Sequence, residues 1–352
     1  MVSKPIRTPA RRRTEYAFSF RRQSSHPTSL ALTARRTIPD SGGVARIYDL
    51  VMTHQLDADD LFIHRVQEHC AHARLNFFLV EPLWVEPFME AFRRDAVWPR
   101  VLLNMHSEHH QPDEVFHRLV RLATERKVRV IDPLDRAIAA FDKARLHPRL
   151  EAAGIQTPFT VVVSAAARGS FRLGDAERAA LGSPFVIKPA LGYGKRGVIL
   201  DAASEADLER SAVQWPGGDF LFQRRIVPRQ LQGEPAYFRA FFVFGSVWVC
   251  WWHHETHRYR LVTWDERTRL GLDPVEELLR RVAALTGMNF FSSEIAQTES
   301  GEFVIIDYVN DQCHMLSQSA SPGNGVPDEL VENIARRLIE AVVEMLRPSR
   351  SP

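Results

Sequence analysis

Between residues 44 and 131, short apolar runs alternate with amphipathic stretches in which apolar residues recur every three or four positions. The pattern predicts strands over 44–51, 75–81, 100–105 and 128–132, and helices over 58–73, 86–96 and 112–127. Regular alternation of strand and helix indicates a small parallel α/β domain. Its ligands are expected at the carboxyl ends of the strands. His106, His109 and His110 follow one such strand, although they equally suit a solvated loop.

The pattern becomes more irregular after residue 132. It predicts one long helix over 134–153 that ends at Gly154, followed by shorter helices over 174–181, 204–215, 273–287 and 326–346. It predicts strands over 155–163, 185–187, 198–200, 218–227, 237–245, 246–252, 289–297 and 302–310. We expect 237–245 and 246–252 to form an antiparallel pair with a tight turn at Gly245-Ser246.

Composition fits a globular protein of two or three lobes. The chain has 352 residues, of which 45% are hydrophobic and 25% charged. No apolar run approaches the roughly 18–20 residues that span a bilayer, so no membrane partner is expected. The three cysteines, Cys70, Cys250 and Cys313, are too few and too widely spaced for a disulfide framework or a zinc site. They suit a reducing compartment, and we expect a cytoplasmic protein.

The charge is distributed unevenly. Residues 1–43 carry nine Lys or Arg and two acids, a net charge of +7, and the remaining residues carry −5. This segment is rich in Arg, Ser, Thr and Pro, and it lacks periodicity, so a disordered tail, or residues ahead of the natural start, is the favoured interpretation. An organellar transit peptide has a similar composition. Nucleic-acid binding through Arg11, Arg12 and Arg13 is disfavoured, because such arms are usually solvated.

The stretch Pro184–Leu200, PFVIKPALGYGKRGVIL, combines a buried strand with a glycine-rich loop and several cations. Gly192, Gly194 and Gly197 allow sharp bends that bring backbone N–H groups close to a ligand. Lys188 and Lys195 indicate that this ligand is an anion. A glycine-rich hairpin with solvated cations is the alternative.

Five features occur in a fixed order: Lys143 in a helix, Lys188 with the glycine loop, the segment FLFQRRIVP (220–228), Arg239, and the acids Glu294 and Asp307 with Asn310. This order resembles the ATP-grasp superfamily, which includes glutathione synthetase, D-alanine–D-alanine ligase and the ribosomal-protein glutamate ligases. The resemblance covers about 132–347. It implies an α/β protein with an ATP-grasp fold after a small parallel α/β domain. The implied parts are a tail (1–43), an N-terminal domain (44–131), a central lobe (132–224) and a C-terminal lobe (225–348).

The resemblance also implies how a nucleotide is held. Lys143 and Lys188 resemble the paired lysines that neutralise the phosphates. The backbone of the glycine loop would close over the phosphates as a lid, through Gly192, Tyr193, Gly194, Lys195 and Gly197. The segment FLFQRRIVP (220–228) resembles the adenine hinge, formed here by Gln223, Arg224, Arg225 and Ile226. The family usually has an acid where Arg224 stands, so only backbone contacts to adenine are carried over there.

Glu294, Asp307 and Asn310 resemble the oxygen ligands of Mg²⁺ or Mn²⁺, since hard cations take carboxylate oxygens together with substrate phosphates. The family spacing is acid-x-Asn, whereas this chain has Asp307-x-x-Asn310. The longer spacing needs a β-bulge or an earlier strand end, and it makes Asp311 a competing ligand. Arg239 resembles the catalytic residue that stabilises the transferring phosphoryl group. A surface arginine is its alternative.

The run WWHHETHRYR (251–260) is predicted to be a strand end and a loop bordering the substrate pocket. His257, Arg258 and Tyr259 are the candidate substrate contacts. A metal site formed by His253, His254 and His257 is disfavoured, because neighbouring side chains of a strand diverge.

Together these features predict an ATP- and Mg²⁺-dependent ligase that joins a carboxylate to an amine or thiol through an acyl-phosphate. The substrate would be a small molecule or a peptide, not a nucleic acid, and a homodimer is left open. Two alternatives remain: a small-molecule kinase of the same superfamily, and a nucleotide-binding regulatory module without turnover.

Overall fold

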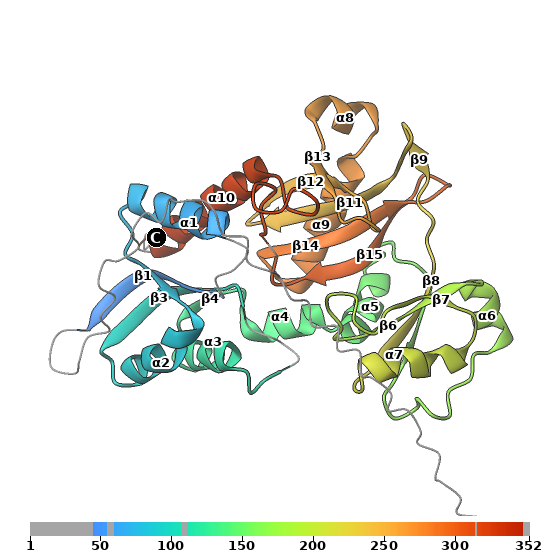
Figure 1. Cartoon of the computed structure of the whole chain (residues 1–352), viewed down its shortest axis with the longest axis horizontal. Helices are drawn as coiled ribbons and strands as arrows, with labels where there is room; N and C mark the ends of the chain where they lie inside the picture. The colour runs from blue at the N-terminus through green and yellow to red at the C-terminus, as the bar shows by residue number, and fades with distance from the viewer. Residues whose placement is uncertain (1–44, 55–59, 107–110, 314, 348–352) are drawn as a thin grey trace, which may run out of the picture. The chain divides into compact units, whose positions relative to one another are not determined.

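The computed structural model describes residues 45–54, 60–106, 111–313 and 315–347 (Figure 1). The predicted tail and the candidate loop residues His109 and His110 lie outside these ranges. None of the helices within them is long and apolar enough to cross a bilayer. Cys70, Cys250 and Cys313 are all buried and have free thiols.

The first sheet is parallel, as the alternating pattern predicts. Its order is β2-β1-β3-β4, and its strands are β1 (Arg46–Thr53), β2 (Phe77–Val80), β3 (Val97–Asn104) and β4 (Arg129–Ile131). The connecting helices are α1 (Asp60–His72), α2 (Val85–Arg93, after the 3₁₀ turn Pro82–Trp84) and α3 (Val115–Glu125). The pattern therefore located every element of this sheet to within a few residues.

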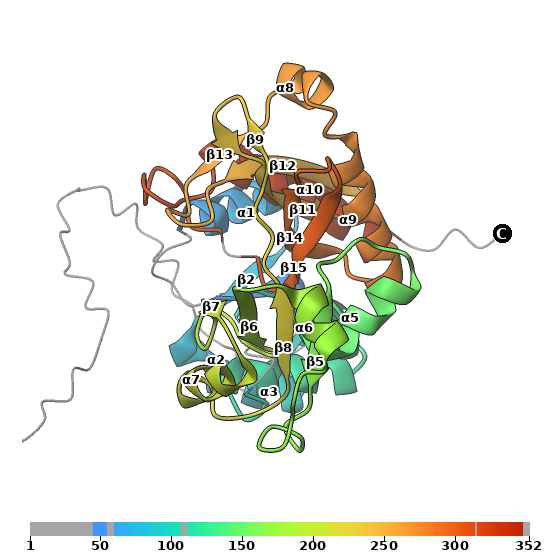
Figure 2. The same ribbon diagram turned by 90° about the vertical axis from the view of Figure 1, so that its right-hand side faces the viewer.

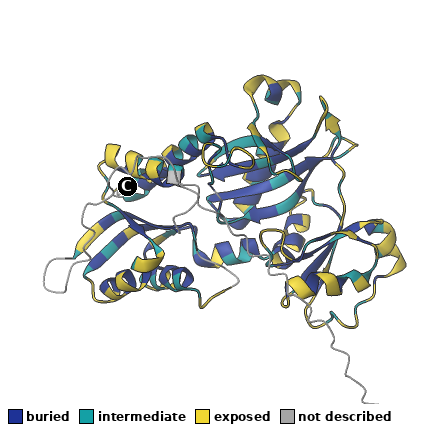
Figure 3. Cartoon of the chain, viewed as in Figure 1, coloured by how far each residue is buried: buried dark blue, intermediate teal, exposed yellow. Residues whose placement is uncertain are grey.

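Each face of the first sheet has its own hydrophobic core. On one face Val51 and Phe78 pack with Phe88 of α2 and Phe116 of α3. The other face is covered by α1 together with the last helix, α10 (Asp328–Leu346), and residues of the two helices belong to one buried cluster. Figure 3 colours the ribbon of the buried residues in these layers dark blue. The end of the chain thus completes the core of its first sheet.

A second, smaller sheet is antiparallel and has the order β5-β8-β6-β7. Its strands are β5 (Thr160–Val163), β6 (Phe185–Pro189), β7 (Ile199–Ala202) and β8 (Phe220–Arg224), and its helices are α6 (Asp175–Leu181), the 3₁₀ turn Glu205–Asp207 and α7 (Leu208–Gln214). β6 and β7 pair on either side of the glycine loop, as predicted. Figure 2 shows the segment that leaves β8 and leads to β9, the first strand of a short two-stranded hairpin.

The third sheet is antiparallel, with the order β13-β12-β11-β14-β15. It contains β11 (Tyr237–Val243), β12 (Ser246–Trp252), β13 (Tyr259–Leu261), β14 (Phe290–Gln297) and β15 (Phe303–Asn310), with α8 (Trp264–Arg269) and α9 (Asp273–Thr286). The short hairpin of β9 (Gln230–Leu231) and β10 (Glu234–Pro235) precedes it.

Two local predictions about this sheet are wrong. The turn between β11 and β12 consists of Phe244 and Gly245, because Val243 pairs with Ser246; both turn residues have positive φ, as in a type I′ hairpin turn. Residues 259–261, predicted to be loop, form the edge strand β13, which pairs with β12.

The predicted long helix over 134–153 is in fact two helices, α4 (Leu134–Phe141) and α5 (Lys143–Ala152). Asp142 separates them, and its carboxylate accepts hydrogen bonds from the backbone N–H groups of Ala144 (3.1 Å) and Arg145 (3.2 Å). Periodicity alone missed this break, because an aspartate that caps a helix N-terminus competes with the continuous helix. Lys143 is therefore the first residue of a helix rather than an internal one.

Candidate functional site

Three strands of the third sheet align three charged residues in one row. Arg239 of β11 lies directly opposite Glu294 of β14, and Glu294 lies directly opposite Asp307 of β15. Side chains of directly opposed residues share one face of a sheet and lie about 5 Å apart at Cβ. Strand pairing alone thus brings Arg239 together with Glu294 and Asp307, although Arg239 lies more than fifty positions before them in the chain.

The middle residue of this row is held on both sides. A guanidinium nitrogen of Arg239 lies 3.1 Å from Glu294 Oε1, and Arg239 Nε donates to Ser292 Oγ at 3.1 Å. Tyr237 Oη donates to Glu294 Oε2 at 3.2 Å. Burial raises the pKa of Glu294, Arg239 opposes this effect, and the neighbouring Asp307 adds to it. The carboxylate is fixed in place, but its charge is only partly compensated.

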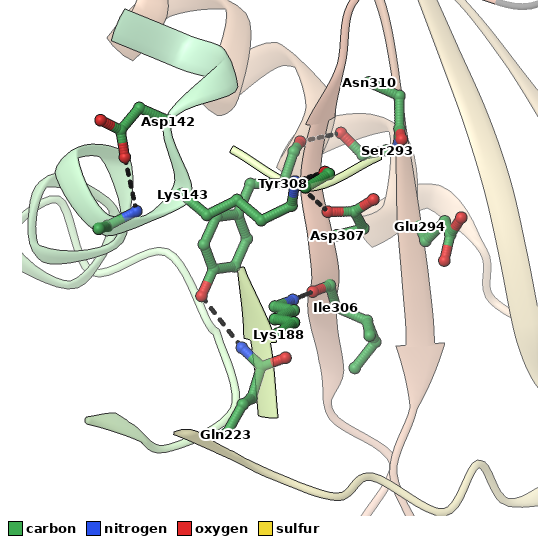
Figure 4. Close-up of polar contacts among 12 residues, drawn as sticks. Asp142, Lys143, Lys188, Gln223, Ser293, Glu294, Ile306, Asp307, Tyr308 and Asn310 are labelled. Carbon is green, nitrogen blue, oxygen red and sulfur yellow. Dashed lines mark hydrogen bonds and ion pairs between the residues drawn. The ribbon is translucent and has the colours of Figure 1, made fainter. Parts of the chain in front are cut away.

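Two lysines reach this row from the small sheet and from α5 (Figure 4). Lys188 Nζ donates to the backbone oxygen of Ile306 at 2.8 Å. Lys143 Nζ lies 3.6 Å from Asp307 Oδ1 and donates to the backbone oxygen of Gly192 at 3.1 Å. Both lysines are more than 90% buried. Buried ammonium groups are costly unless anions compensate them, and such concentrations of buried charge mark candidate functional sites.

The pKa values reflect this crowding. Burial lowers the pKa of Lys188 to about 8; Asp307 opposes the shift and Lys143 adds to it. Burial also disfavours the ionised form of Asp307, but Lys143 and Lys188 outweigh it, so the pKa of Asp307 is lowered. At neutral pH the site therefore contains a largely charged Lys188 and an ionised Asp307.

The glycine loop lies against this cluster through its backbone. Gly192 supplies the oxygen that binds Lys143. Gly197 has φ +75°, and an added Cβ would lie 2.8 Å from Pro189 Cγ, so only glycine fits there without movement. Lys195 donates to the backbone oxygen of His254 at 2.8 Å, which links the loop to the turn after β12. The side chain of Tyr193 instead packs against Trp215 at the end of α7.

Only part of the predicted hinge faces the site with its side chains. Gln223 is buried, and its Nε2 donates to Thr160 Oγ1 (3.0 Å) and to Tyr308 Oη (3.1 Å). Arg224 is exposed, and its Nε donates to the backbone oxygen of Ala180 at 2.6 Å, at the end of α6. Arg225 is exposed, and Ile226 packs against the cluster of Tyr237 and Trp252.

The spacing Asp307-x-x-Asn310 is accommodated by a β-bulge, one of the two expected solutions. Ser292 pairs with Asn310 and Glu294 pairs with Asp307, so Tyr308 and Val309 together face the single residue Ser293. Asn310 ends β15, and its Nδ2 donates to the backbone oxygen of Ser292 at 3.3 Å. The sequence could not specify how the side chains of the bulge would point.

The turn after β12 is built from stacked aromatic rings. The ring of His257 stacks on Trp252 at 5.5 Å, and His254 stacks on Tyr237 at 5.3 Å. Arg258 is exposed, whereas Tyr259 lies in β13, where burial raises its pKa to about 12. Among the described residues, no group of three or more His, Cys, Asp or Glu side chains could hold a metal ion, which leaves the His253-His254-His257 metal interpretation without support.

Sequence reasoning missed three participants: Tyr237, Tyr308 and His147. Tyr237 precedes Arg239 by two residues on one strand and therefore shares its face, a signal that alternation could have revealed. Tyr308 and His147 meet through a hydrogen bond between residues 161 positions apart, which no local pattern shows.

The donor set fits a divalent cation and phosphate groups. Asp307 Oδ1 is buried and makes no hydrogen bond; Lys143 Nζ lies 3.6 Å away, beyond hydrogen-bond distance, so this oxygen can still accept a cation or another donor. Glu294 and Asp307 offer hard oxygen ligands on one face, as Mg²⁺ prefers. The two ammonium groups and the guanidinium supply compact positive charge for phosphate oxygens.

Comparison with solved structures identifies the fold. A RimK domain ATP-grasp protein from Sphaerobacter thermophilus matches with a TM-score of 0.56 and 18% identity, over 84% of this chain and 98% of that one. D-alanine–D-alanine ligase from Bacillus anthracis, complexed with ATP, matches with a TM-score of 0.58 and 15% identity, over 86% and 97%. The protein has the ATP-grasp fold.

A third structure with this fold is the ATP-grasp ligase PsnB complexed with a minimal precursor, Mg and ADP, which matches with a TM-score of 0.55 and 14% identity, over 84% of this chain and 98% of that one. No protein-family model matches the chain. No curated protein matches it in sequence. The fold inferred from five ordered sequence features is therefore confirmed by structure alone.

Proposed function

We propose that the protein is an ATP- and Mg²⁺-dependent ligase that activates a carboxylate as an acyl-phosphate and transfers the acyl group to an amine or thiol. The observation that carries this proposal is the row of Arg239, Glu294 and Asp307, which faces the buried Lys143 and Lys188. Solved structures with the same fold include ligases with bound ATP or with Mg and ADP.

In this proposal the lysines hold phosphate oxygens. Lys188 and Lys143 already point to the strand that carries Asp307, so their ammonium groups need no large movement to bind an anion. The main chain of Gly192, Tyr193, Gly194, Lys195 and Gly197 covers the phosphates and excludes water. Gln223 through Ile226 form the edge of the base pocket, with Arg224 contributing only its backbone, since its side chain binds the end of α6.

Glu294, Asp307 and Asn310 are the proposed ligands of Mg²⁺, or of Mn²⁺ in its place. When bound, the cation supplies charge that neutralises phosphate oxygens and orients them for in-line transfer. Arg239 lies next to Glu294 and stabilises negative charge on the transferring group, because a guanidinium forms strong, charge-assisted hydrogen bonds with phosphate oxygens. Tyr237 keeps Glu294 in position.

The parallel domain 44–131 and the turn containing His257, Arg258 and Tyr259 are the proposed substrate-binding regions, for a small molecule or a peptide. The central lobe would extend over 132–224 and the C-terminal lobe over 225–348. Of the three turn residues, Arg258 is the best placed for direct contact because it is exposed.

The experiment is a screen of amino acids, peptides and sugar acids for substrate-dependent ADP formation, with hydroxylamine present to trap acyl-phosphate as hydroxamate. We expect ADP and hydroxamate from the wild type, and a loss of at least a hundredfold for Glu294→Gln. Glu277→Gln, an exposed change on α9, is the matched control and should behave as the wild type. ADP without hydroxamate would indicate a kinase, and ATP binding without any turnover would indicate a regulatory module.

A further inference from the structure

Tyr308 occupies the bulge that distinguishes this chain from the usual acid-x-Asn spacing. Because Tyr308 and Val309 share one partner, Ser293, the strand carries one additional residue directly after Asp307. The hydroxyl of Ser293 donates to the backbone oxygen of Tyr308 and fixes the bulge. Tyr308 is completely buried, and Figure 4 shows its ring lying between Lys143 and Lys188.

The phenol oxygen of Tyr308 is held by two elements that are distant in sequence. It lies 2.8 Å from His147 Nδ1 of α5 and accepts from Gln223 Nε2 of β8 at 3.1 Å. Burial lowers the pKa of His147, Lys188 adds to this effect, and Glu151, 3.3 Å from Nε2, opposes it without reversing it. The imidazole therefore favours its neutral form, in which Nδ1 can accept the phenol proton. Both polar functions of the hydroxyl are thereby satisfied, and the ring has one fixed orientation.

The ring in turn contacts the phosphate lysine. Lys188 Nζ lies 5.2 Å from the centroid of the Tyr308 ring, within the range of a cation–π interaction. Such contacts are strongest where water is excluded, and both groups are buried here. The long, flexible side chain of Lys188 thus packs against the Tyr308 ring, whose hydroxyl is hydrogen-bonded to β8 and to α5.

We propose that Tyr308 is a positioning residue for nucleotide phosphates, whose ring, locked by His147 and Gln223, holds the ammonium of Lys188 where the phosphates bind. This inference rests on the proposed nucleotide-binding function. In this role Tyr308, in the bulge, connects Gln223 of the proposed adenine pocket with Lys188 of the proposed phosphate site.

The test compares ligands that differ only in their phosphates. Dissociation constants of ATP and ADP with Mg²⁺ are measured by calorimetry, and that of adenosine by ligand-observed NMR. For Tyr308→Leu we expect ATP affinity to fall about tenfold while adenosine affinity changes less than twofold. Tyr308→Phe retains the ring and should lose only part of the ATP affinity.

His147 provides a matched pair of variants. His147→Asn keeps a hydrogen-bonding atom near the position of Nδ1 and should retain the wild-type ratio of adenosine to ATP dissociation constants. His147→Leu removes that atom and should lower the ratio, as Tyr308→Phe does. If Tyr308→Leu fails to fold in a thermal unfolding assay, these two variants and Tyr308→Phe carry the test.

The outcomes separate the two proposals. An unchanged ratio in Tyr308→Leu, or equal losses for adenosine and ATP, would overturn the positioning role and leave the nucleotide site intact. A wild-type protein that binds neither ATP nor ADP would overturn the proposed function, and the role of Tyr308 with it.

Discussion

The small sheet contributes Lys188 to the candidate site, the five-stranded sheet contributes the carboxylates of Glu294 and Asp307 beside Arg239, and the lysines and the carboxylates are held differently. Lys188 stands on an inner strand of the small sheet, and Lys143 begins a helix. Both reach the site through four-carbon side chains. Glu294 and Asp307 stand on neighbouring strands, and strand pairing fixes their spacing with little dependence on side-chain conformation.

This difference separates two tasks. The lysines reach phosphate oxygens through long side chains and can be positioned by their neighbours, as Tyr308 positions Lys188, whereas a divalent cation needs carboxylates at a constant separation. We therefore expect variants of the small sheet to affect phosphate affinity in general, and variants of the five-stranded sheet to affect its dependence on Mg²⁺. The predictions below test that division.

The largest effect is expected for Lys188→Met, which keeps the length of the side chain but removes its charge. Loss of a buried, charge-assisted contact to phosphate should weaken ATP binding about 100-fold, or about 2.7 kcal/mol. Calorimetry should show this loss both with Mg²⁺ and in EDTA. A loss confined to Mg²⁺ conditions would contradict the division between the sheets.

A smaller and more selective effect is expected for Asp307→Asn. Removing one hard oxygen ligand should reduce ATP affinity about 30-fold with Mg²⁺ present. In EDTA the variant should bind at least as well as the wild type, because Lys143 is released from its carboxylate partner. Glu277→Gln again serves as the control, and equal losses in both buffers would contradict the assignment.

The smallest effect on ATP affinity is expected from a change in pH. With a pKa of about 8, the free protein carries a charged Lys188 below pH 8 and progressively loses it above. ATP affinity should therefore be nearly constant from pH 6.5 to 7.5 and fall by about tenfold towards pH 9. Lys188→Met should be flat over the upper range. A wild-type affinity that rises above pH 8 would show that another group controls binding.

The sequence predicted most elements of the fold because alternation and amphipathic periodicity are local properties. The order of Lys143, Lys188, Arg239, Glu294 and Asp307 was sufficient for the ATP-grasp resemblance, and the solved structures confirm that fold. The same local signals failed where one residue competes with a pattern. Asp142 ends a helix that periodicity would continue, and Phe244 adopts a turn conformation that glycine usually supplies.

Contacts between distant segments could not be predicted in the same way. The bulge at Tyr308 was one of two ways to accommodate the spacing to Asn310, and sequence alone could not choose between them. The contact of Lys195 with the backbone oxygen of His254 depends on how two loops pack together. Every residue has a backbone oxygen, so the residue type at position 254 could not indicate this contact. Such contacts decide which of several polar residues join a site.

The position of α10 has a consequence for how this protein is made. The helix shares a buried cluster with α1 and with the strands β1 and β3, yet it is translated after every other described helix and strand. Until α10 has been synthesised, the face of the first sheet that α1 and α10 share is therefore only partly covered, and its exposed apolar surface favours aggregation or chaperone binding. A fragment that stops before α10 should be insoluble even though its entire parallel sheet has been synthesised.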